Sequence, residues 1–161
     1  MKIIIADSST LITLLDTNNF SLLFELFNKI IITDEVYREI TYKFQHKQKI
    51  DEYLCLNSLE LQSIEHQELY EMLIVGLDKG EAESIALAKK LELSLIIDER
   101  KGRNIAKSLG INIIGLVGLI LKLMEKNIIS KERAITIVDE VEANNFRLSA
   151  GLKDLVYNYS S

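Results

Sequence analysis

The sequence predicts an α/β fold in which a parallel β-sheet is covered by helices on both faces. Short runs rich in Ile and Leu alternate with longer segments of helical periodicity along most of the chain. The runs are apolar on both faces, which is typical of strands buried between two helical layers. Strands that alternate with helices in this way favour parallel pairing through helical crossovers.

The first strand is predicted at Lys2–Ala6 and the second at Ile30–Ile32, because both runs are apolar and rich in β-branched residues. A helix should begin at Ser8 or Ser9, directly after the first strand. Turn residues at 16–19 interrupt the helical pattern that follows. We therefore expect two short helices between the first two strands.

A further helix should follow the second strand. Thr33 or Asp34 can cap it, and Val36, Ile40 and Phe44 would form its apolar face.

The periodicity is weaker between residues 45 and 63, where 53–56 and 59–61 are consistent with another strand or a hairpin. Beyond this region the alternation resumes, with strands predicted at Leu93–Ile97 and Ile111–Ile114. Helices are predicted at 68–76, from the turn at 78–80 to about 91, and at 100–110, 115–126, 130–142 and 151–159.

Length and composition indicate one globular domain. The chain has 161 residues, of which 48% are hydrophobic and 27% charged, and no linker or repeat divides it. A net charge of -5 mildly disfavours nucleic-acid binding unless a local patch or a cation reverses the charge. Cys55 is the single cysteine, and no apolar run is long enough for a secretion signal or a membrane span, so we expect a cytoplasmic protein.

Two acidic residues follow predicted strands directly. Asp7 comes after the first strand, and Asp98 comes after the strand at Leu93–Ile97. The carboxyl ends of neighbouring parallel strands meet at one edge of a sheet, so these side chains should lie close together if the strands are neighbours. Either Asp alone could simply cap the next helix, and their pairing is what favours a site.

Glu39 and Glu81 are the other acidic candidates. Glu39 lies one helical turn after Glu35 and can reach the same edge, although an isolated Glu most often lies on a solvated face. Glu81 has capping-box spacing to Asp78, and Glu83 faces another side of the same helix. We expect one of Glu81 and Glu83 in the site and the other supporting it.

Carboxylates brought together repel one another, an arrangement that is tolerated mainly when a cation neutralises them. Oxygen ligands without sulfur or imidazole suit Mg²⁺ or Mn²⁺, and such an ion favours hydrolysis of phosphoesters. Ser9 could support a ligand carboxylate with a hydrogen bond, or it could start the helix.

Basic residues follow Asp98 closely. Arg100, Lys101 and Arg103 could bind a polyanionic backbone such as RNA beside the acidic site, or they could form an ordinary solvated helix face. The sequence contains no phosphate-binding glycine loop, no dinucleotide fingerprint and no serine nucleophile elbow.

Four segments in combination resemble the PIN-domain family. They are Ile-Ile-Ala-Asp-Ser-Ser at 4–9, Val-Tyr-Arg-Glu-Ile at 36–40, Gly-Glu-Ala-Glu-Ser-Ile-Ala-Leu-Ala at 80–88 and Ile-Ile-Asp-Glu-Arg-Lys-Gly-Arg at 96–103. The best match is the prokaryotic branch with the Gly-Glu-Ala-Glu helix, which is related to VapC-type toxins. The resemblance implies a three-layer α/β/α sandwich over 1–127, and 128–161 would be a helical extension packed on the same domain.

The resemblance also implies the site residues. Asp7, Glu39, Glu81 and Asp98 match the four catalytic acids, with Glu99 as the alternative to Asp98. The metal ligands would be Asp7 and Glu81 with Asp98 and Glu99. Glu81 stands where the toxins usually have Asp, which lengthens that ligand by one methylene group.

The implied function is a Mg²⁺- or Mn²⁺-dependent endoribonuclease, in particular the toxin of a toxin–antitoxin pair, with a homodimer and an antitoxin as expected partners. The alternative is a catalytically inactive PIN-like module that binds RNA or protein. A phosphoacceptor receiver domain is a weaker third reading, because such a domain has a pair of acids after its first strand and Asp7 stands there without an adjacent acid.

Overall fold

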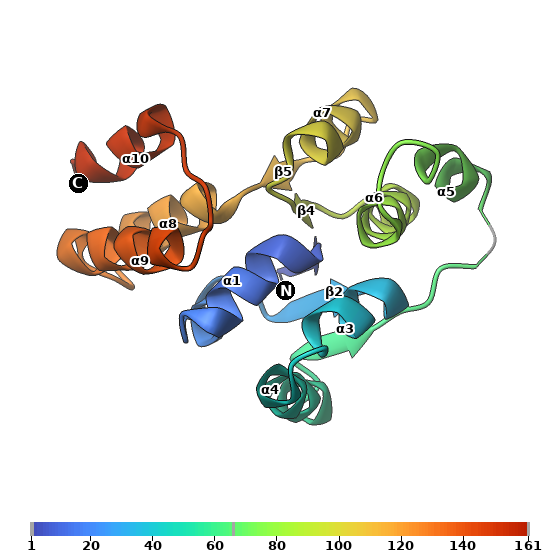
Figure 1. Cartoon of the computed structure of the whole chain (residues 1–161), viewed down its shortest axis with the longest axis horizontal. Coiled ribbons are helices and arrows are strands. Elements are labelled where there is room, and N and C mark those ends of the chain that lie inside the picture. Colours follow the sequence, from blue (N-terminus) through green and yellow to red (C-terminus); the bar gives the residue numbers. More distant parts are fainter. Residues whose placement is uncertain (1, 66, 161) are drawn as a thin grey trace.

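The structure, a computed structural model, describes residues 2–65 and 67–160. Its centre is a five-stranded sheet in the order β3-β2-β1-β4-β5, in which every neighbouring pair is parallel. Helices cover both faces (Figure 1), so the predicted three-layer α/β/α sandwich is confirmed. The strands are β1 Ile3–Ala6, β2 Lys29–Ile32, β3 Leu59–Leu61, β4 Leu95–Ile96 and β5 Ile113–Ile114.

Strand β1 lies where the strand order reverses. Strands β2 and β3 lie on one side of β1, and strands β4 and β5 lie on the other. Ile5 pairs with Ile31 of β2 and with Leu95 of β4, so the strands that precede Asp7 and Asp98 are neighbours as expected. In open parallel sheets, functional groups gather in the crevice beyond the carboxyl ends of strands at such a reversal.

Each face of the sheet has its own core, because successive side chains of a strand point to opposite faces. Ile4 and Ile30 belong to the first core, and Ile5 and Ile31 belong to the second. The helices of the first core are α1 Ser8–Asp16, the short η1 Phe20–Leu22, α2 Leu23–Leu26, α3 Asp34–Ile40, α4 Phe44–Cys55, α8 Leu116–Glu125, α9 Lys131–Ala143 and α10 Ala150–Tyr157. Those of the second are α5 Glu68–Leu73, α6 Lys79–Leu91 and α7 Arg100–Ser108. None of the helices in the described ranges is long and apolar enough to cross a membrane.

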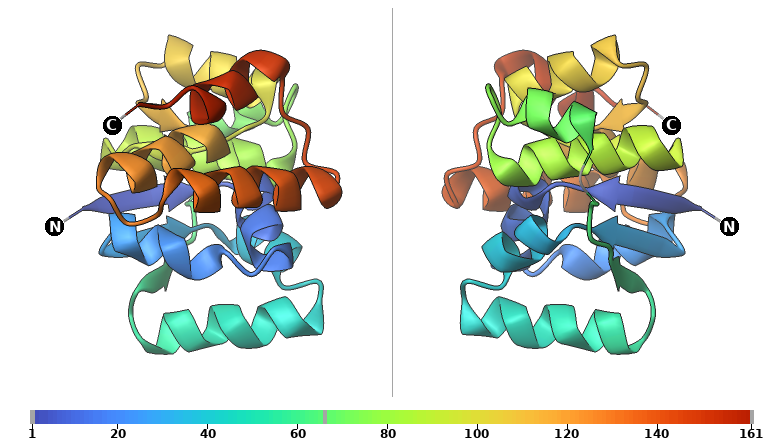
Figure 2. Two further views of the ribbon diagram at one scale, coloured as in Figure 1. Left: turned by 90° about the vertical axis from the view of Figure 1, so that its left-hand side faces the viewer. Right: turned by 90° about the vertical axis from the view of Figure 1, so that its right-hand side faces the viewer.

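Helix α4 corrects the sequence prediction for this part of the chain. Phe44 was expected on one helical face with Val36 and Ile40, but α3 ends at Ile40 and Phe44 begins α4 with 71% of its surface exposed. Residues 53–56 end this helix rather than forming a strand, whereas the segment at 59–61 does form β3. Figure 2 shows α4 at the margin of the molecule, below the sheet in both views.

The sparse burial of α4 explains why its pattern was missed. Only His46 and Ile50 of this helix are fully buried, so its apolar periodicity is weak. His46 Nε2 lies 3.1 Å from Asp16 Oδ1 at the end of α1, which ties the helix to the sandwich through a polar contact. Polar contacts of this kind leave no periodic signal in the sequence.

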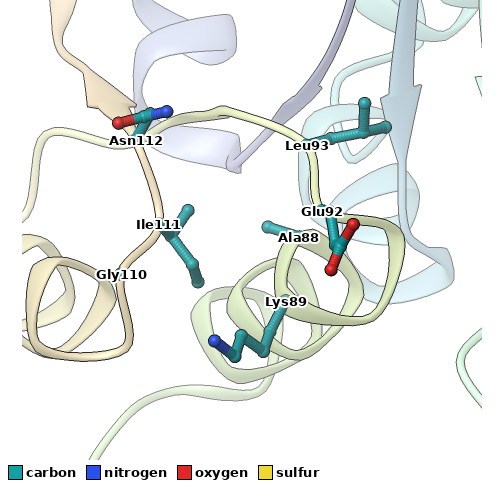
Figure 3. Close-up of a pocket in the computed structure, with 7 residues that line it drawn as sticks. All are labelled: Ala88, Lys89, Glu92, Leu93, Gly110, Ile111 and Asn112. Carbon is teal, nitrogen blue, oxygen red and sulfur yellow. The ribbon is translucent and has the colours of Figure 1, made fainter.

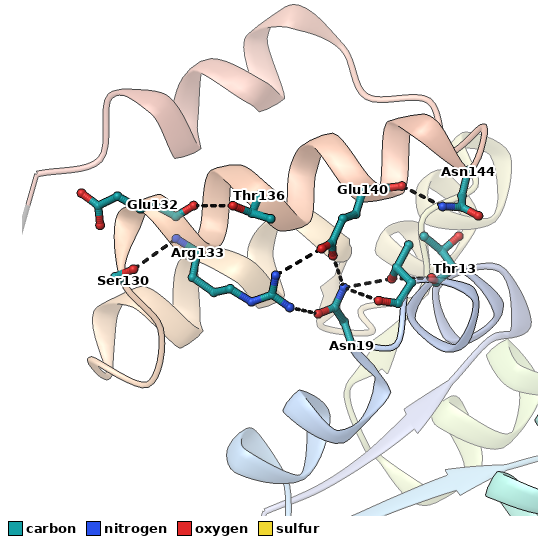
Figure 4. A network of polar contacts seen from close by, with 9 residues as sticks. Thr13, Asn19, Ser130, Glu132, Arg133, Thr136, Glu140 and Asn144 are labelled. Carbon is teal, nitrogen blue, oxygen red and sulfur yellow. Dashed lines mark hydrogen bonds and ion pairs between the residues drawn. The ribbon is translucent and has the colours of Figure 1, made fainter.

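A polar network fixes α9 against the turn between α1 and η1 (Figure 4). Asn19 is 1% exposed, donates to Glu140 Oε2 at 2.8 Å and accepts a hydrogen bond from the Arg133 guanidinium. Arg133 also contacts Glu140 at 3.3 Å. Val138 and Val156 add buried contacts, so the C-terminal helices share the first core, and the domain boundary at residue 127 stays a prediction.

Candidate active site

Asp7 is buried at the carboxyl end of β1, with only 3% of its surface exposed. It stands at the N-cap of α1, yet its side chain makes no capping hydrogen bond, and its Oδ1 atom has no hydrogen-bond partner among residues 2–65 and 67–160. Burial raises the pKa of Asp7 to about 7; the Ser8 backbone N–H opposes this shift, and the charges of Glu81, Asp78 and Glu39 add to it. A buried carboxylate with an unsatisfied oxygen among other acids is an arrangement that a cation would relieve.

Glu39 reaches the same space from α3. Its Oε2 accepts a hydrogen bond from the Ser8 hydroxyl, and its other oxygen lies against Gly80, where an added Cβ atom would overlap it. Burial is the largest cause that raises the pKa of Glu39, and the charge of Asp78 adds to it. Glu39 is therefore held between α1 and α6 and does not lie on a solvated helix face.

Glu81 projects from the first turn of α6 and is 6% exposed. Asp78 caps this helix by accepting a hydrogen bond from the Glu81 N–H at 2.8 Å. Burial raises the pKa of Glu81 to about 7, and the charges of Asp78 and Glu99 contribute. Glu81 Oε1 also lies close to Gly102, because a Cβ atom there would be 3.4 Å away, and Glu99 caps α7 by accepting from the Gly102 N–H at 2.8 Å.

Asp98 lies in different surroundings. Both of its carboxylate oxygens are 3.1 Å from the Leu116 N–H, and the Thr10 hydroxyl donates to Oδ2. Burial raises the pKa of Asp98, while these hydrogen bonds and the charge of Arg103 lower it. Its partners thus join β4 to the starts of α1 and α8, whereas the exposed Glu99 lies near Glu81. The assignment of the fourth acid to Asp98 stays a prediction, and the geometry favours Glu99.

Two residues were expected to support the site. Glu83 accepts a hydrogen bond from the Glu35 N–H at 3.1 Å, so α6 holds the start of the helix that carries Glu39, which fits a supporting role. Ser9 Oγ is buried without a hydrogen-bond partner and touches none of the acids through a hydrogen bond among the described residues. Its neighbour Ser8 makes the contact that was expected of Ser9.

The basic residues after Asp98 divide into two groups. Arg103 donates to the Ile97 carbonyl at 2.8 Å, so its guanidinium is part of the scaffold. Arg100 is exposed at the start of α7, and the ammonium group of Lys101 lies against the loop at Gly76. Arg100 and Lys101 are therefore the two of the three that can offer a charge to a ligand.

The donor atoms of this acidic cluster fit Mg²⁺ or Mn²⁺. All are carboxylate oxygens, and the unsatisfied Oδ1 of Asp7 is the atom most in need of a partner. In residues 2–65 and 67–160, no three His, Cys, Asp or Glu side chains already stand close enough to hold an ion.

Sequence reasoning treated Ser8 and Asp78 only as residues at helix starts and gave Thr10 no role, whereas the structure places all three beside the acids. Asp78 carried a signal, because its capping position places its charge beside the helix start. Ser8 and Thr10 carried a weaker one. They flank Ser9 on one helix, and helical rotation of about 100° per residue sends consecutive side chains in different directions.

The parallel sandwich and the carboxylates at its point of strand reversal define a class of α/β proteins with an acidic site. A family model described as a PIN domain matches residues 3–159. The chain therefore belongs to the PIN-domain family, whose members are typically nucleases and generally use divalent metal ions.

One solved structure supports the same fold. A PilT N-terminus domain protein from the hyperthermophilic archaeon Sulfolobus solfataricus P2 matches with a TM-score of 0.51 and 22% sequence identity, over 74% of this chain and 92% of that one. A domain of a functionally unknown protein from Methanocaldococcus jannaschii DSM 2661 matches with a TM-score of 0.49 and 17% identity, over 72% and 91% of the two chains. No curated protein matches the sequence. At these identities, the likeness concerns the fold alone.

Proposed function

We propose that this protein is a divalent-metal-dependent endoribonuclease that hydrolyses RNA phosphodiester bonds. The observation that carries the proposal is Asp7, a buried carboxylate with an unsatisfied oxygen and a pKa raised to about 7 among other acids. Membership of a family of nucleases supplies the reaction class. A Mg²⁺ or Mn²⁺ ion bound there would neutralise the acids, bind a phosphate oxygen and acidify a water for attack on phosphorus.

The residues of the site have separate tasks in this proposal. Asp7, Glu39, Glu81 and Glu99 would hold the ion, while Ser8 fixes the orientation of Glu39 through its hydroxyl. Arg100 and Lys101 contact the RNA backbone beside the site.

A cleavage assay with matched variants tests the proposal. The purified protein is incubated with end-labelled RNA in Mn²⁺, in Mg²⁺ and with a chelator, beside Asp7→Asn. We expect metal-dependent cuts that fall by at least about a hundredfold in Asp7→Asn, because a ligand of the ion loses its charge. Cleavage by Asp7→Asn at the wild-type rate would overturn the role given to Asp7.

A second candidate is a PIN-like module that binds RNA or protein without catalysis. The observation that favours it is that no three acidic side chains in the described ranges stand at metal-binding distance. Calorimetric titration with Mn²⁺ separates the two candidates. No Mn²⁺ binding at millimolar concentration, together with RNA binding, would establish the binding module.

The finer biological role proposed is that of a toxin in a toxin–antitoxin pair, acting in the cytoplasm as a homodimer restrained by an antitoxin protein. Exposed apolar side chains at Tyr42, Phe44 and Val75 offer surface for such partners. Induced expression should arrest growth, and Asp7→Asn should not. Light scattering on the purified protein tests the dimer independently of activity.

A further inference from the structure

A groove of about 360 Å³ lies at the amino edge of the sheet, the edge opposite to the acidic cluster. Its lining comes from the starts of β1 and β5, from the residue before β4, from Phe27 and from α8. Asp7 and Lys2 are five residues apart in an extended segment, so the two edges are roughly 16 Å apart. The groove is lined by Lys2, Ile3, Ile4, Phe27, Ser94, Asn112, Ile113, Ile114 and Lys122, and no carboxylate is among them.

Three lysines concentrate positive charge at this groove. Lys2 and Lys122 line it directly, and Lys126 follows Lys122 by one helical turn. Among the described residues, none of the three forms an ion pair with an acidic side chain. Burial lowers the pKa of Lys2, and the charges of Lys122 and Lys126 lower it further, which is consistent with three ammonium groups that share one neighbourhood.

The helix dipole explains the position of two of these three lysines but not of the third. Cations near a helix C-terminus are stabilised by the helix dipole, which accounts for Lys122 and Lys126 at the end of α8. It does not account for Lys2, which precedes β1 and whose ammonium lies 5.0 Å from the centre of the Phe27 ring. The convergence of these lysines from two elements on one groove points to an anionic ligand.

The remaining walls indicate what is attached to the anion. Ile3, Ile113 and Ile114 are half-buried, so part of their apolar surface is open to the groove. Ser94 and Asn112 also line the groove, and a hydroxyl and an amide can form hydrogen bonds with a polar heterocycle. The volume falls within the range of small-molecule sites.

We propose that this groove binds a nucleoside phosphate, with the phosphate at Lys2, Lys122 and Lys126 and the base on the apolar wall. The ligand is either a free mononucleotide or the terminal nucleotide of an RNA. The inference goes beyond the proposed nuclease activity, since it concerns the other edge of the sheet and none of the acids takes part.

A neighbouring cavity shows by contrast what an internally satisfied pocket looks like. It has about 240 Å³, shares Asn112 with the groove, and lies between the end of α6 and the segment before β5 (Figure 3). Lys89 there donates to the Leu109 carbonyl at 2.8 Å, and Glu92 adds a negative charge to the lining. Because the Lys89 ammonium already binds a backbone carbonyl, we propose no anion site in this cavity.

Calorimetric titration in chelator tests the proposal without any contribution from cleavage. The wild-type protein is titrated with AMP, with inorganic phosphate and with adenosine. We expect AMP to bind more tightly than either part alone. In Lys122→Ala/Lys126→Ala, the Kd for AMP should rise by about tenfold or more, because two charges near the phosphate are lost.

The matched control is Lys107→Ala/Lys131→Ala, which removes the same charge from exposed lysines on α7 and α9 and should leave AMP binding unchanged. If the first double variant does not fold, as judged by circular dichroism, the exposed single variant Lys126→Glu takes its place. Equal AMP binding in the lysine variants and the control, phosphate binding as tightly as AMP, or no binding of AMP or RNA by the wild type would each overturn the proposal.

A second arm identifies the source of the nucleotide. In the Asp7→Asn background, a short RNA with a 5′-phosphate is compared with the same RNA without it. Binding of free AMP that depends on the groove lysines supports a mononucleotide ligand. Binding of the phosphorylated RNA alone, with the same dependence on those lysines, supports an RNA end as the ligand.

Discussion

The two edges of the sheet carry opposite charges, with acidic side chains at the carboxyl edge and lysines at the amino edge. At the carboxyl edge, Asp7, Glu39 and Glu81 are buried or half-buried together, and each has a pKa raised chiefly by burial. At the amino edge, Lys2 and Lys122 line an open groove and have no acidic partners in the part of the chain that the structure describes. A net charge of -5 therefore conceals a strongly uneven distribution, and the average charge of the chain is a poor guide to what it binds.

Helix direction explains why the two charges separate in this way. Helices that follow parallel strands begin at the carboxyl edge and end at the amino edge, so their positive ends face the acids and their negative ends face the lysines. The acidic edge nevertheless gathers more negative charge than the helix ends offset, since the pKa values of Asp7 and Glu81 still rise to about 7. This imbalance is what the following changes probe.

The largest expected effect concerns the fourth acid. Glu99→Gln should lower both Mn²⁺ affinity and RNA cleavage by about a hundredfold, because it removes a charge beside Glu81 while its amide oxygen can still cap α7. Asp98→Asn should mainly lower the free energy of unfolding, by about 1 kcal/mol, because it weakens the contact with the Leu116 N–H. Calorimetry, cleavage assays and urea denaturation measure these effects. The reverse pattern would make Asp98 the fourth acid.

The raised pKa of Asp7 should be detectable in the pH dependence of the free energy of unfolding. Its folded pKa of about 7 lies above the ordinary value of 3.8, so the folded state holds the proton more tightly and the free energy of unfolding falls as pH rises from about 4 to 7. In metal-free protein, Asp7→Asn should therefore be more stable than wild type by about 4 kcal/mol at pH 8, and this advantage should vanish near pH 4. Urea denaturation in chelator at the two pH values measures it. A pH-independent difference would contradict the raised pKa.

The network at Asn19 should affect stability alone, which sharpens the separation of the two edges. Asn19→Ala removes an amide that joins Arg133 and Glu140 near the end of α1, and we expect the free energy of unfolding to fall by about 1–2 kcal/mol. Metal affinity should be unchanged, because no acid of the carboxyl edge contacts Asn19. Thermal melts and Mn²⁺ titration of the same variant check both statements, and a loss of metal affinity would show that the edges are coupled.

The smallest effect is expected at Ser8. Ser8→Ala frees Glu39 from its hydroxyl partner, and we expect cleavage to fall by roughly tenfold through lost orientation. Ser9→Ala is the matched control, because its hydroxyl is buried without a partner and should matter little to Glu39. If Ser9→Ala is the more damaging of the two in cleavage assays, the sequence prediction for Ser9 is right and the role given to Ser8 is wrong.

Much of the fold could be predicted from the sequence because it rests on local patterns. Apolar runs predicted the positions of four strands along the chain, and capping residues such as Thr33 and Asp78 marked helix starts that the structure reproduces. Helix α4 was missed because it buries only His46 and Ile50, and its attachment through Asp16 is a contact between distant segments. Propensity and periodicity contain no information about such a contact.

The proximity of the acids could be predicted from the sequence, but their individual contacts could not. Asp7 and the neighbouring strands could be placed because parallel strands present their ends together. The choice between Asp98 and Glu99 depends on where the Leu116 N–H comes to lie, which is set by the packing of α8. Lys2 and Lys122 are far apart in the sequence, and only the completed sheet brings them to one groove.

Gly80 shows that stability and activity oppose each other at one position of α6. Alanine is the stronger helix former by up to about 1 kcal/mol, so Gly80→Ala should make the helix more stable. The added methyl group would nevertheless occupy the place of the Glu39 carboxylate and push it away from Asp7. The Gly80→Ala protein should thus be more stable than wild type and keep every acid, yet its acidic site should no longer function. Selection for stability alone would remove this glycine, and selection for the reaction would keep it.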